Sequence, residues 1–193
     1  MRSEPNAFPE TVDTERLRLR RWRPDDRDAH AAIWAEPDVW ESLHAGEPGD
    51  PAEAAAESFD RHLHHWERHG WGTWAAIEPA SGKLAGWLGA SHPTFIPDVA
   101  HEIEVGWTLR RSFWGRGLAT EGARAAVEAA STQLAPPRLI SLILPTNSRS
   151  IAVAERLGMS AAELVTHPEL GAELRVYELK SSSGASPHSV SSR

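Results

Sequence analysis

A glycine-containing loop between a strand-like and a helix-like segment restricts this chain more than any other feature. Residues 101–109 have a strand pattern, residues 110–119 are rich in Arg and Gly, and a helical pattern then continues to about Leu134. Glycine lets the backbone approach a ligand closely, and the first N–H groups of a helix have no partner within the helix. The junction therefore predicts an anion-binding turn where a strand ends and a helix begins.

Phosphate or pyrophosphate is the expected guest of this loop. Arg110, Arg111 and Arg116 place cationic side chains around it. The loop lacks the Lys-Ser/Thr pair of a Walker A motif and the third Gly of a dinucleotide fingerprint, so ATP and NAD are poor candidates. A Gly-x-Gly sequence at such a junction can also be a tight turn without a ligand, and the loop alone leaves both interpretations open.

The patterns along the rest of the chain predict a mixed α/β (α+β) fold. Period-two and short apolar runs indicate strands at residues 16–20, 71–77, 84–91, 101–109, 138–144, 161–165 and 173–179. Amphipathic runs with capping signals indicate helices at residues 24–35, in a shorter piece from Asp38, at 51–69, from the Gly loop to 134, and at 148–157. We expect a mostly antiparallel central sheet of about seven strands, flanked by about four helices.

Composition and charge narrow the classes of function. The chain has 193 residues, which suits one domain, and its lack of cysteine excludes disulfides, thiolate metal sites and a Cys nucleophile. The formal net charge of −7 argues against nonspecific binding of nucleic acid, which needs a basic footprint. A cationic substrate remains possible, as does a polyanionic cofactor held by a local basic patch.

The two ends of the chain differ from its middle. Residues 181–193 are Ser-rich with almost no large apolar side chains, which predicts a disordered tail after a domain at 14–180; residues 1–13 form an N-terminal extension. The N-terminus lacks the apolar segment of a signal peptide, and no stretch approaches the roughly 18 apolar residues of a membrane span. We therefore expect a cytoplasmic protein with no membrane partner.

A second motif opens the helix at 148–157. Asn147 is a good N-cap, and Ser150 lies three positions on in the first turn, so both polar side chains can face the same opening. A capped helix packing on Val153 and Leu157 explains Asn147 without requiring Ser150. The motif is thus structural at least in part.

Together these features resemble one known family. The strand EVGWTL (104–109), the loop FWGRGLATEG (113–122), and Asn147-x-x-Ser150 followed by ERLGM (155–159) occur in this order. They are similar to the motifs of the GNAT superfamily of N-acetyltransferases, and within it to the RimJ/RimL-like branch. The opening TERLRLR (14–20) also resembles the first strand of that branch. The resemblance covers residues 14–180.

The resemblance implies that acetyl-CoA is the co-substrate and that it binds where the fourth and fifth strands splay apart. The pyrophosphate would lie on the N–H groups of residues 116–120, the pantetheine arm would pair with backbone at 107–109, and Asn147 would hydrogen-bond that arm. Trp114 stands where the superfamily usually has Gln or Arg, so the arginines near the loop would supply the charge. The implied cofactor-binding residues are Trp107, Thr108, Leu109, Arg110, Gly115, Arg116, Gly117, Leu118, Ala119, Thr120 and Asn147.

The expected reaction is acetyl transfer to a primary amine, either a protein N-terminal α-amine or a small-molecule amine. Such an amine must lose a proton before it attacks. Glu104 matches the acidic position of the branch motif and is our first candidate for the base, although it could instead be a salt-bridged strand residue. The alternatives are His101, Glu102, Glu169 or a chain of water molecules. Ser150 matches the position assigned to the leaving thiolate.

The absence of cysteine predicts direct transfer in a ternary complex, without an acetyl-cysteine intermediate. The alternative function is a non-catalytic acyl-CoA-binding sensor or scaffold. The amine acceptor would be the partner, nucleic acid would not, and the chain could be a monomer or a homodimer.

Three further groups of residues have two interpretations each. His62, His65 and His69 could hold a metal, but their neighbours indicate a solvated helix face, so no metal is expected. Trp71, Trp74 and Trp87 suit the core or the wall of an acceptor pocket. The basic residues between Arg16 and Arg23 fit best as the charged outer face of an edge strand.

Overall fold

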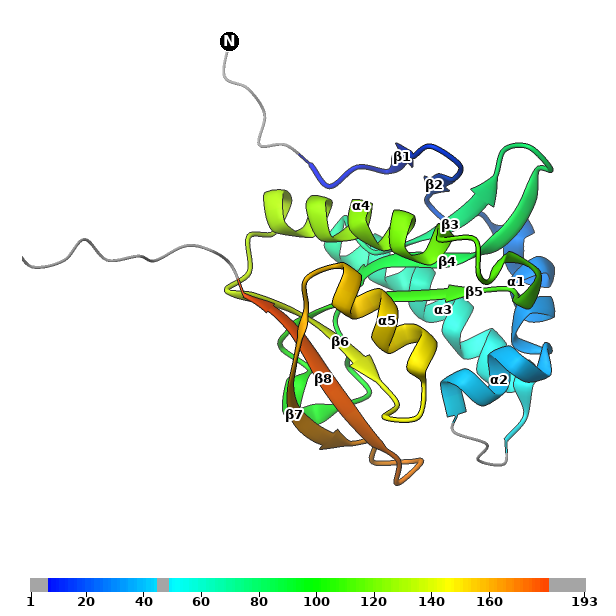
Figure 1. Cartoon of the computed structure of the whole chain (residues 1–193). Helices are drawn as coiled ribbons and strands as arrows, with labels where there is room; N and C mark the ends of the chain where they lie inside the picture. Colours follow the sequence, from blue (N-terminus) through cyan, green and yellow to red (C-terminus); the bar gives the residue numbers. More distant parts are fainter. Residues whose placement is uncertain (1–6, 45–48, 181–193) are drawn as a thin grey trace, which may run out of the picture.

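The computed structural model describes residues 7–44 and 49–180 of the chain. In this part, eight strands form one sheet in the order β1-β2-β3-β4-β5-β6-β8-β7 (Figure 1). The strands are β1 Thr11–Asp13, β2 Arg18–Arg20, β3 Thr73–Glu78, β4 Lys83–Ser91, β5 Ile103–Leu109, β6 Arg138–Ile143, β7 Ser160–Thr166 and β8 Glu173–Lys180. The Ser-rich segment 181–193 lies outside the described residues.

The sheet is antiparallel except where β5 meets β6, and there it opens. The parallel pairing of these two strands is confined to Ile103 with Leu139 and Glu104 with Ile140. Beyond that point β5 continues along β4 as far as Leu109, while β6 continues along β8 as far as Ile143. The sheet therefore divides into two halves that diverge. This confirms the opening expected between the fourth and fifth predicted strands.

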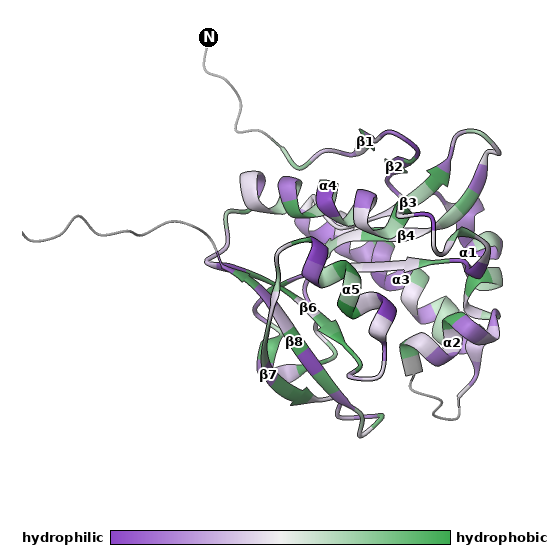
Figure 2. Ribbon diagram, in the orientation of Figure 1, coloured by the Kyte–Doolittle hydropathy of each residue, from purple (hydrophilic) through white to green (hydrophobic). Residues whose placement is uncertain are grey.

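Five α-helices cover the sheet within the described residues (Figure 1). They are α1 Arg27–Trp34, α2 Pro37–His44, α3 Pro51–His69, α4 Leu118–Gln133 and α5 Ser148–Arg156. None of the helices in this part of the chain is long and apolar enough to cross a membrane. In Figure 2 hydrophilic and hydrophobic residues alternate along α4 and α5, as expected for helices with one buried face.

Helices lie on both faces of the sheet because side chains alternate along β4. Trp87 packs with Phe59 of α3 in one core, and Leu88 packs with Ala126 of α4 in another. Gly122 of α4 brings that helix close, because a Cβ there would lie 2.9 Å from a methyl group of Leu88. The two faces are called here the α1–α3 side and the α4 side of the sheet.

The fold class confirms the sequence prediction, with one more strand than expected, and the shorter piece predicted from Asp38 is the helix α2. The additional strand β1 has three residues, too few to show a period, and it exists through its pairing with β2. Phe8 also joins the core, at 6% exposure, so packing begins before the expected boundary at residue 14. Helix α3 has the expected limits: the Asp50 side chain caps its start, and Gly70 ends it in the left-handed conformation.

Candidate active site

A cleft of about 1260 Å³ opens where β5 and β6 diverge. The Gly loop, α4 and α5 line it on the α4 side, and residues of α1, α2 and α3 line it on the other side. Most of the sequence-predicted site residues lie along this cleft. They are Glu104, Trp107, Thr108, Leu109, Gly115, Gly117, Leu118, Ala119, Thr120, Asn147 and Ser150.

The ladder between β4 and β5 leaves alternate backbone groups of β5 pointing into the cleft. The backbone N–H of Arg110 donates to the carbonyl oxygen of Ala85 at 2.8 Å. Hydrogen-bonded pairs alternate along an antiparallel ladder, so Thr108 also bonds to β4. The backbone groups of Trp107 and the N–H of Leu109 then point toward the diverging β6, while the Leu109 carbonyl oxygen accepts from the Trp114 indole. An extended, amide-bearing ligand can pair with them as an added strand.

The Gly loop has the backbone geometry that its sequence demands. Gly115 and Gly117 have φ of 72° and 77°, a region that side-chain-bearing L-residues rarely occupy. Gly117 is the N-cap of α4 and supplies no side-chain cap, so the N–H groups of Leu118, Ala119 and Thr120 lack intrahelical acceptors. These three residues line the cleft, and the positive end of the helix dipole is directed there. The loop is therefore suited to bind a phosphate group.

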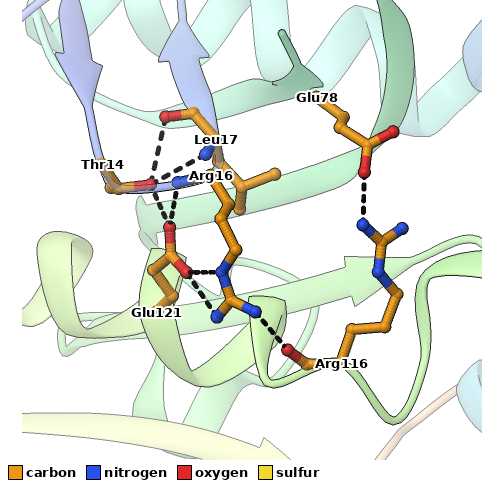
Figure 3. Close-up of polar contacts among 6 residues, drawn as sticks. All are labelled: Thr14, Arg16, Leu17, Glu78, Arg116 and Glu121. Carbon is orange, nitrogen blue, oxygen red and sulfur yellow. Dashed lines mark hydrogen bonds and ion pairs between the residues drawn. The ribbon is translucent and has the colours of Figure 1, made fainter. Parts of the chain in front are cut away.

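Arg16 and Glu121 fasten the N-terminal segment to this loop (Figure 3). Arg16 Nη1 donates to the carbonyl oxygen of Arg116 at 2.7 Å, and Arg16 Nε donates to Glu121 at 2.8 Å. Glu121 also accepts from the Thr14 hydroxyl at 2.6 Å and from the Arg16 N–H at 2.7 Å. Burial raises the pKa of Glu121, but these bonds outweigh it and lower that pKa overall. Arg16, expected on a solvated strand edge, instead fixes the loop.

Arg16→Ala should therefore weaken CoA binding without abolishing the fold. Loss of the bond to the Arg116 carbonyl frees the loop. Because Arg16 is partly exposed and acts on CoA only through the loop, we expect a loss of about 0.7–1.4 kcal/mol, which is roughly a three- to tenfold higher Kd. Isothermal titration with CoA measures it. Arg18→Ala is the matched control, because Arg18 pairs with Asp13 in an exposed contact away from the loop. An equal loss in both variants would contradict the fastening role.

The three arginines expected around the loop are engaged with carboxylates instead. Arg110 Nε donates to Glu36 at 2.7 Å, Arg111 Nε lies 3.4 Å from Asp38, and Arg116 is paired with Glu78. None of the three is among the described residues that line the cleft. On the α4 side the cleft is lined by other cations, which are Arg16, Arg124, Arg149 and Arg156.

Arg149 is the cation that sequence reasoning missed nearest the loop. It follows Asn147 by two residues in the first turn of α5, and its guanidinium carbon lies 4.9 Å from the centre of a Trp114 ring. Trp114 is itself fixed, because its indole N–H donates to the Leu109 carbonyl at 2.6 Å. The signal in the sequence was a basic residue beside the Asn-x-x-Ser motif, seven residues before Arg156.

Arg149→Ala and Arg110→Ala should separate the two possible phosphate partners. Among the described residues Arg149 contacts the Trp114 ring and forms no ion pair, so its loss should raise the Kd for CoA about three- to tenfold, less so at high salt. Arg110 is neutralised by Glu36, so its loss should change that Kd less. Titration at two salt concentrations measures both values. A larger, salt-dependent loss in Arg110→Ala would restore the sequence-based expectation.

Asn147 begins α5 as predicted and also connects it to α2. Its Oδ1 accepts from the Ser150 N–H at 3.1 Å, and its Nδ2 donates to the Ser42 carbonyl oxygen at 3.3 Å. The cap uses the backbone N–H of Ser150 and not its hydroxyl. The hydroxyl of Ser150 is therefore compatible with a contact to a thiolate in the cleft.

Glu104 lines the cleft on the α1–α3 side of the sheet. Its neighbour Val105 is buried in the core on the α4 side, so alternation directs Glu104 the other way. Burial raises the pKa of Glu104 to about 7, although a hydrogen bond from the Leu142 N–H opposes the shift. A carboxylate with such a pKa can take a proton and release it near neutral pH.

The other carboxylate candidates are placed elsewhere. Glu102 pairs with Arg138 at 3.0 Å, and Arg138 also holds Glu163 and Glu178. His101 is highly exposed and lies 3.4 Å from Glu102. Glu169 is exposed on the turn between β7 and β8. None of these candidates is among the described residues lining the cleft, which leaves Glu104 as the candidate base that does line it.

The histidines of α3 belong to hydrogen-bond networks. His65 accepts from the His92 N–H at 3.1 Å through Nε2, so its Nδ1 donates to the Trp71 carbonyl at 2.8 Å. His62 contacts the hydroxyl of Thr73 at 2.7 Å. Burial lowers the pKa of His62 and brings that of His65 to about 4, so both rings are neutral near pH 7. The described residues contain no cluster of three or more His, Asp or Glu able to hold a metal.

Of the three hairpin tryptophans, Trp87 lines the cleft, stacked on Trp34 with ring centres 5.8 Å apart. Trp74 is fully buried, and its indole N–H donates to the Pro9 carbonyl. Trp71 packs against Phe8. Of the two interpretations, the core holds for Trp71 and Trp74, and Trp87 is the one of the three that lines the cleft.

Known proteins share this architecture. The model of the acetyltransferase (GNAT) domain matches residues 16–160. A solved acetyltransferase from Agrobacterium tumefaciens is 30% identical, with a TM-score of 0.75, over 94% of this chain and 100% of that one. Structures of ribosomal-protein acetyltransferases, at 16–18% identity and TM-scores of 0.65–0.69, share the fold.

Two curated relatives match over part of their length. The FsC-acetyl coenzyme A-N(2)-transacetylase of Aspergillus fumigatus is 29% identical over 79% of this chain and 66% of its own length. A Bacillus subtilis protein, YkkB, is 29% identical over 58% of this chain and 63% of its own length. The matches thus span slightly less than two thirds of these two relatives. Because the domain model covers most of the chain and a solved acetyltransferase is 30% identical to it, the chain belongs to the acetyltransferase (GNAT) family, whose chemistry is acetyl-CoA-dependent acetyl transfer.

Proposed function

We propose that this protein transfers the acetyl group of acetyl-CoA directly to a primary amine within a ternary complex. One observation carries the proposal: a single cleft joins the anion-binding Gly loop, the open backbone of β5 and the carboxylate of Glu104. Each part suits one part of the reaction, in the order pyrophosphate, pantetheine and acceptor amine. The N(2)-transacetylase name of the Aspergillus relative supports a nitrogen acceptor.

In this proposal, Glu104 prepares the acceptor. An amine is mostly ammonium near pH 7, and Glu104 takes its proton directly or through one water. The nitrogen then attacks the thioester carbon and forms the new C–N bond. The backbone N–H of Leu109, which points into the cleft, is placed to stabilise the oxyanion. The proposal therefore assigns base and oxyanion donor to one strand.

Breaking the C–S bond releases the CoA thiolate, which ends as the free thiol after gaining a proton. The Ser150 hydroxyl lies along the cleft and is proposed to hydrogen-bond that sulfur or to relay a proton through water. The chain has no cysteine to carry an acetyl group, so both substrates must be bound together. The motifs favour either a protein N-terminal α-amine, which the resemblance to the RimJ/RimL-like branch implies, or a small-molecule amine.

Thiol release from acetyl-CoA in the presence of a panel of amines tests the proposal. Turnover that needs both substrates, with intersecting initial-rate plots, is expected for a ternary complex. Tight CoA binding without turnover on any amine would instead favour a non-catalytic acyl-CoA sensor. Thermal stabilisation by ATP but not by CoA would contradict the assignment of the Gly loop.

A further inference from the structure

We infer that the acceptor is a small amine with an apolar body and a carboxylate, and that Arg61 of α3 binds this carboxylate. The inference rests on the proposed function and names its substrate class. It comes from a side pocket on the α1–α3 side of the cleft, where the residues are apolar except for a cation and a histidine.

The side pocket, of about 180 Å³, continues from the main cleft. Both cavities are lined by Trp34, Leu43, Arg61, Phe95, Leu144 and Leu174. Leu170 and His167, on the turn between β7 and β8, complete the smaller one. Phe95 is 41% exposed, which is unusual for a large apolar residue beside a core, and an apolar ligand group would cover it. The small volume suits one side chain rather than a continuing peptide.

The charged residues on this side of the cleft indicate that the acceptor also has a carboxylate. On this side of the cleft, Glu104 is the carboxylate among the described lining residues, and Glu15 and Glu121 lie by the Gly loop. A polycationic acceptor would need several carboxylates, and this side offers arginines instead, namely Arg61 and Arg68. Among these residues, Arg61 also lines the side pocket.

Arg61 is only weakly engaged by the protein. Its Nη1 lies 3.7 Å from a carboxylate oxygen of Glu57 one turn earlier, and both side chains are more than half exposed. Such exposed pairs contribute little. The Glu169 carboxylate acts on Arg61 only through its charge. The planar guanidinium can therefore donate two parallel hydrogen bonds to a ligand carboxylate.

The two anchors define the product. An acceptor that reaches both Glu104 and Arg61 would lie along Leu144 and Leu174, which line both cavities. Transfer would form the N–C bond, break the thioester C–S bond, and release an N-acetyl amino acid and free CoA thiol. The amine proton would leave through Glu104.

Matched acceptors test the substrate class. We expect wild-type kcat/KM for leucine to exceed that for isoamylamine, which lacks the carboxylate, and for leucinamide, which masks it, by at least about tenfold. A peptide with an N-terminal leucine is the fourth acceptor. Equal or better acetylation of the uncharged acceptors or of the peptide would overturn the inference and leave the proposed function intact. If CoA binds but neither these four acceptors nor any other amine is acetylated, both this inference and the proposed function are refuted.

Substitutions of Arg61 test whether it binds the carboxylate of the acceptor. Arg61→Gln should lower kcat/KM for leucine by about tenfold or more and change that for isoamylamine by less than about twofold. Arg61→Lys should restore part of the leucine rate because it keeps the charge and loses the fork. Arg68→Gln, two turns along the same helix, should keep the preference for the carboxylate. Equal losses on leucine and isoamylamine in Arg61→Gln, with an unchanged melting temperature, would refute carboxylate binding by Arg61.

Discussion

Glu104→Gln should lower kcat by about a hundredfold or more, because a positioned general base contributes about 10²–10⁴-fold to such a reaction. The Kd for CoA should stay within about twofold, since the residue lies on the acceptor side of the sheet, away from the Gly loop. Single-turnover rates and CoA titration measure the two quantities. Glu102→Gln is the matched control, because Glu102 is held by Arg138 away from the cleft and its loss should change turnover only slightly.

The pH dependence gives a sharper test of the same residue. With the pKa of Glu104 raised to about 7, wild-type kcat should rise as pH increases through about 7 and the carboxylate loses its proton. An alkylamine acceptor, whose own pKa lies near 10, keeps the two ionisations apart. In Glu104→Gln, the fall in kcat below about pH 7 should be absent. A wild-type pH profile in the variant would remove Glu104 from the mechanism and direct attention to Glu102 or Glu169.

Stability supplies a readout independent of activity. The protonated form of Glu104 is favoured in the folded state, so wild-type stability falls as pH rises from about 4.5 to about 7. Gln cannot ionise and avoids this loss. Glu104→Gln should therefore match the wild type in acid and exceed it in melting temperature above pH 7. No difference across this range would show that the carboxylate is well solvated in the folded protein.

The parts of the site that follow from local conformation could be predicted from the sequence. Gly117 supplies the left-handed backbone conformation at the start of α4, and the Asn147 side chain caps an N–H group at the start of α5. Such features depend on a few neighbouring residues, so a single sequence contains most of the information. Residues 107–109 enter the site only through the resemblance to the GNAT motifs, which implies that their backbone pairs with the pantetheine arm.

Features that depend on distant partners could not be predicted. Arg110 and Arg149 look alike as cations near the motifs, but Glu36, more than seventy residues before Arg110, neutralises the first. Trp74 and Trp87 also look alike on one hairpin, yet strand alternation and the helices on each face put Trp74 in the core and Trp87 on the cleft. The side pocket combines residues of α1, α2, α3 and the β7–β8 turn, among others, so its composition appears only once the chain is folded.

Gly117→Val should weaken CoA binding by about tenfold or more, the largest effect expected on the cofactor side. The φ of 77° is a conformation that a β-branched residue adopts only with strain, so the loop and the first turn of α4 must shift. That shift misaligns the N–H groups of residues 118–120 that are proposed to bind the pyrophosphate. The added side chain also stands where the phosphate approaches. Titration with CoA measures the loss.

Gly82→Val separates the binding effect from backbone strain. Gly82 has a similar φ of 67°, a Cβ there would meet no atom within 4 Å, and it is not among the described residues lining the cleft. Both variants should lose comparable stability, about 1–2 kcal/mol for one left-handed residue. Only Gly117→Val should also lose CoA affinity. The CoA affinity of Gly117→Val could be unchanged although its melting temperature falls as much as that of Gly82→Val. In that case the backbone of this loop does not bind the phosphate, and the arginines of α4 and α5 bind it instead.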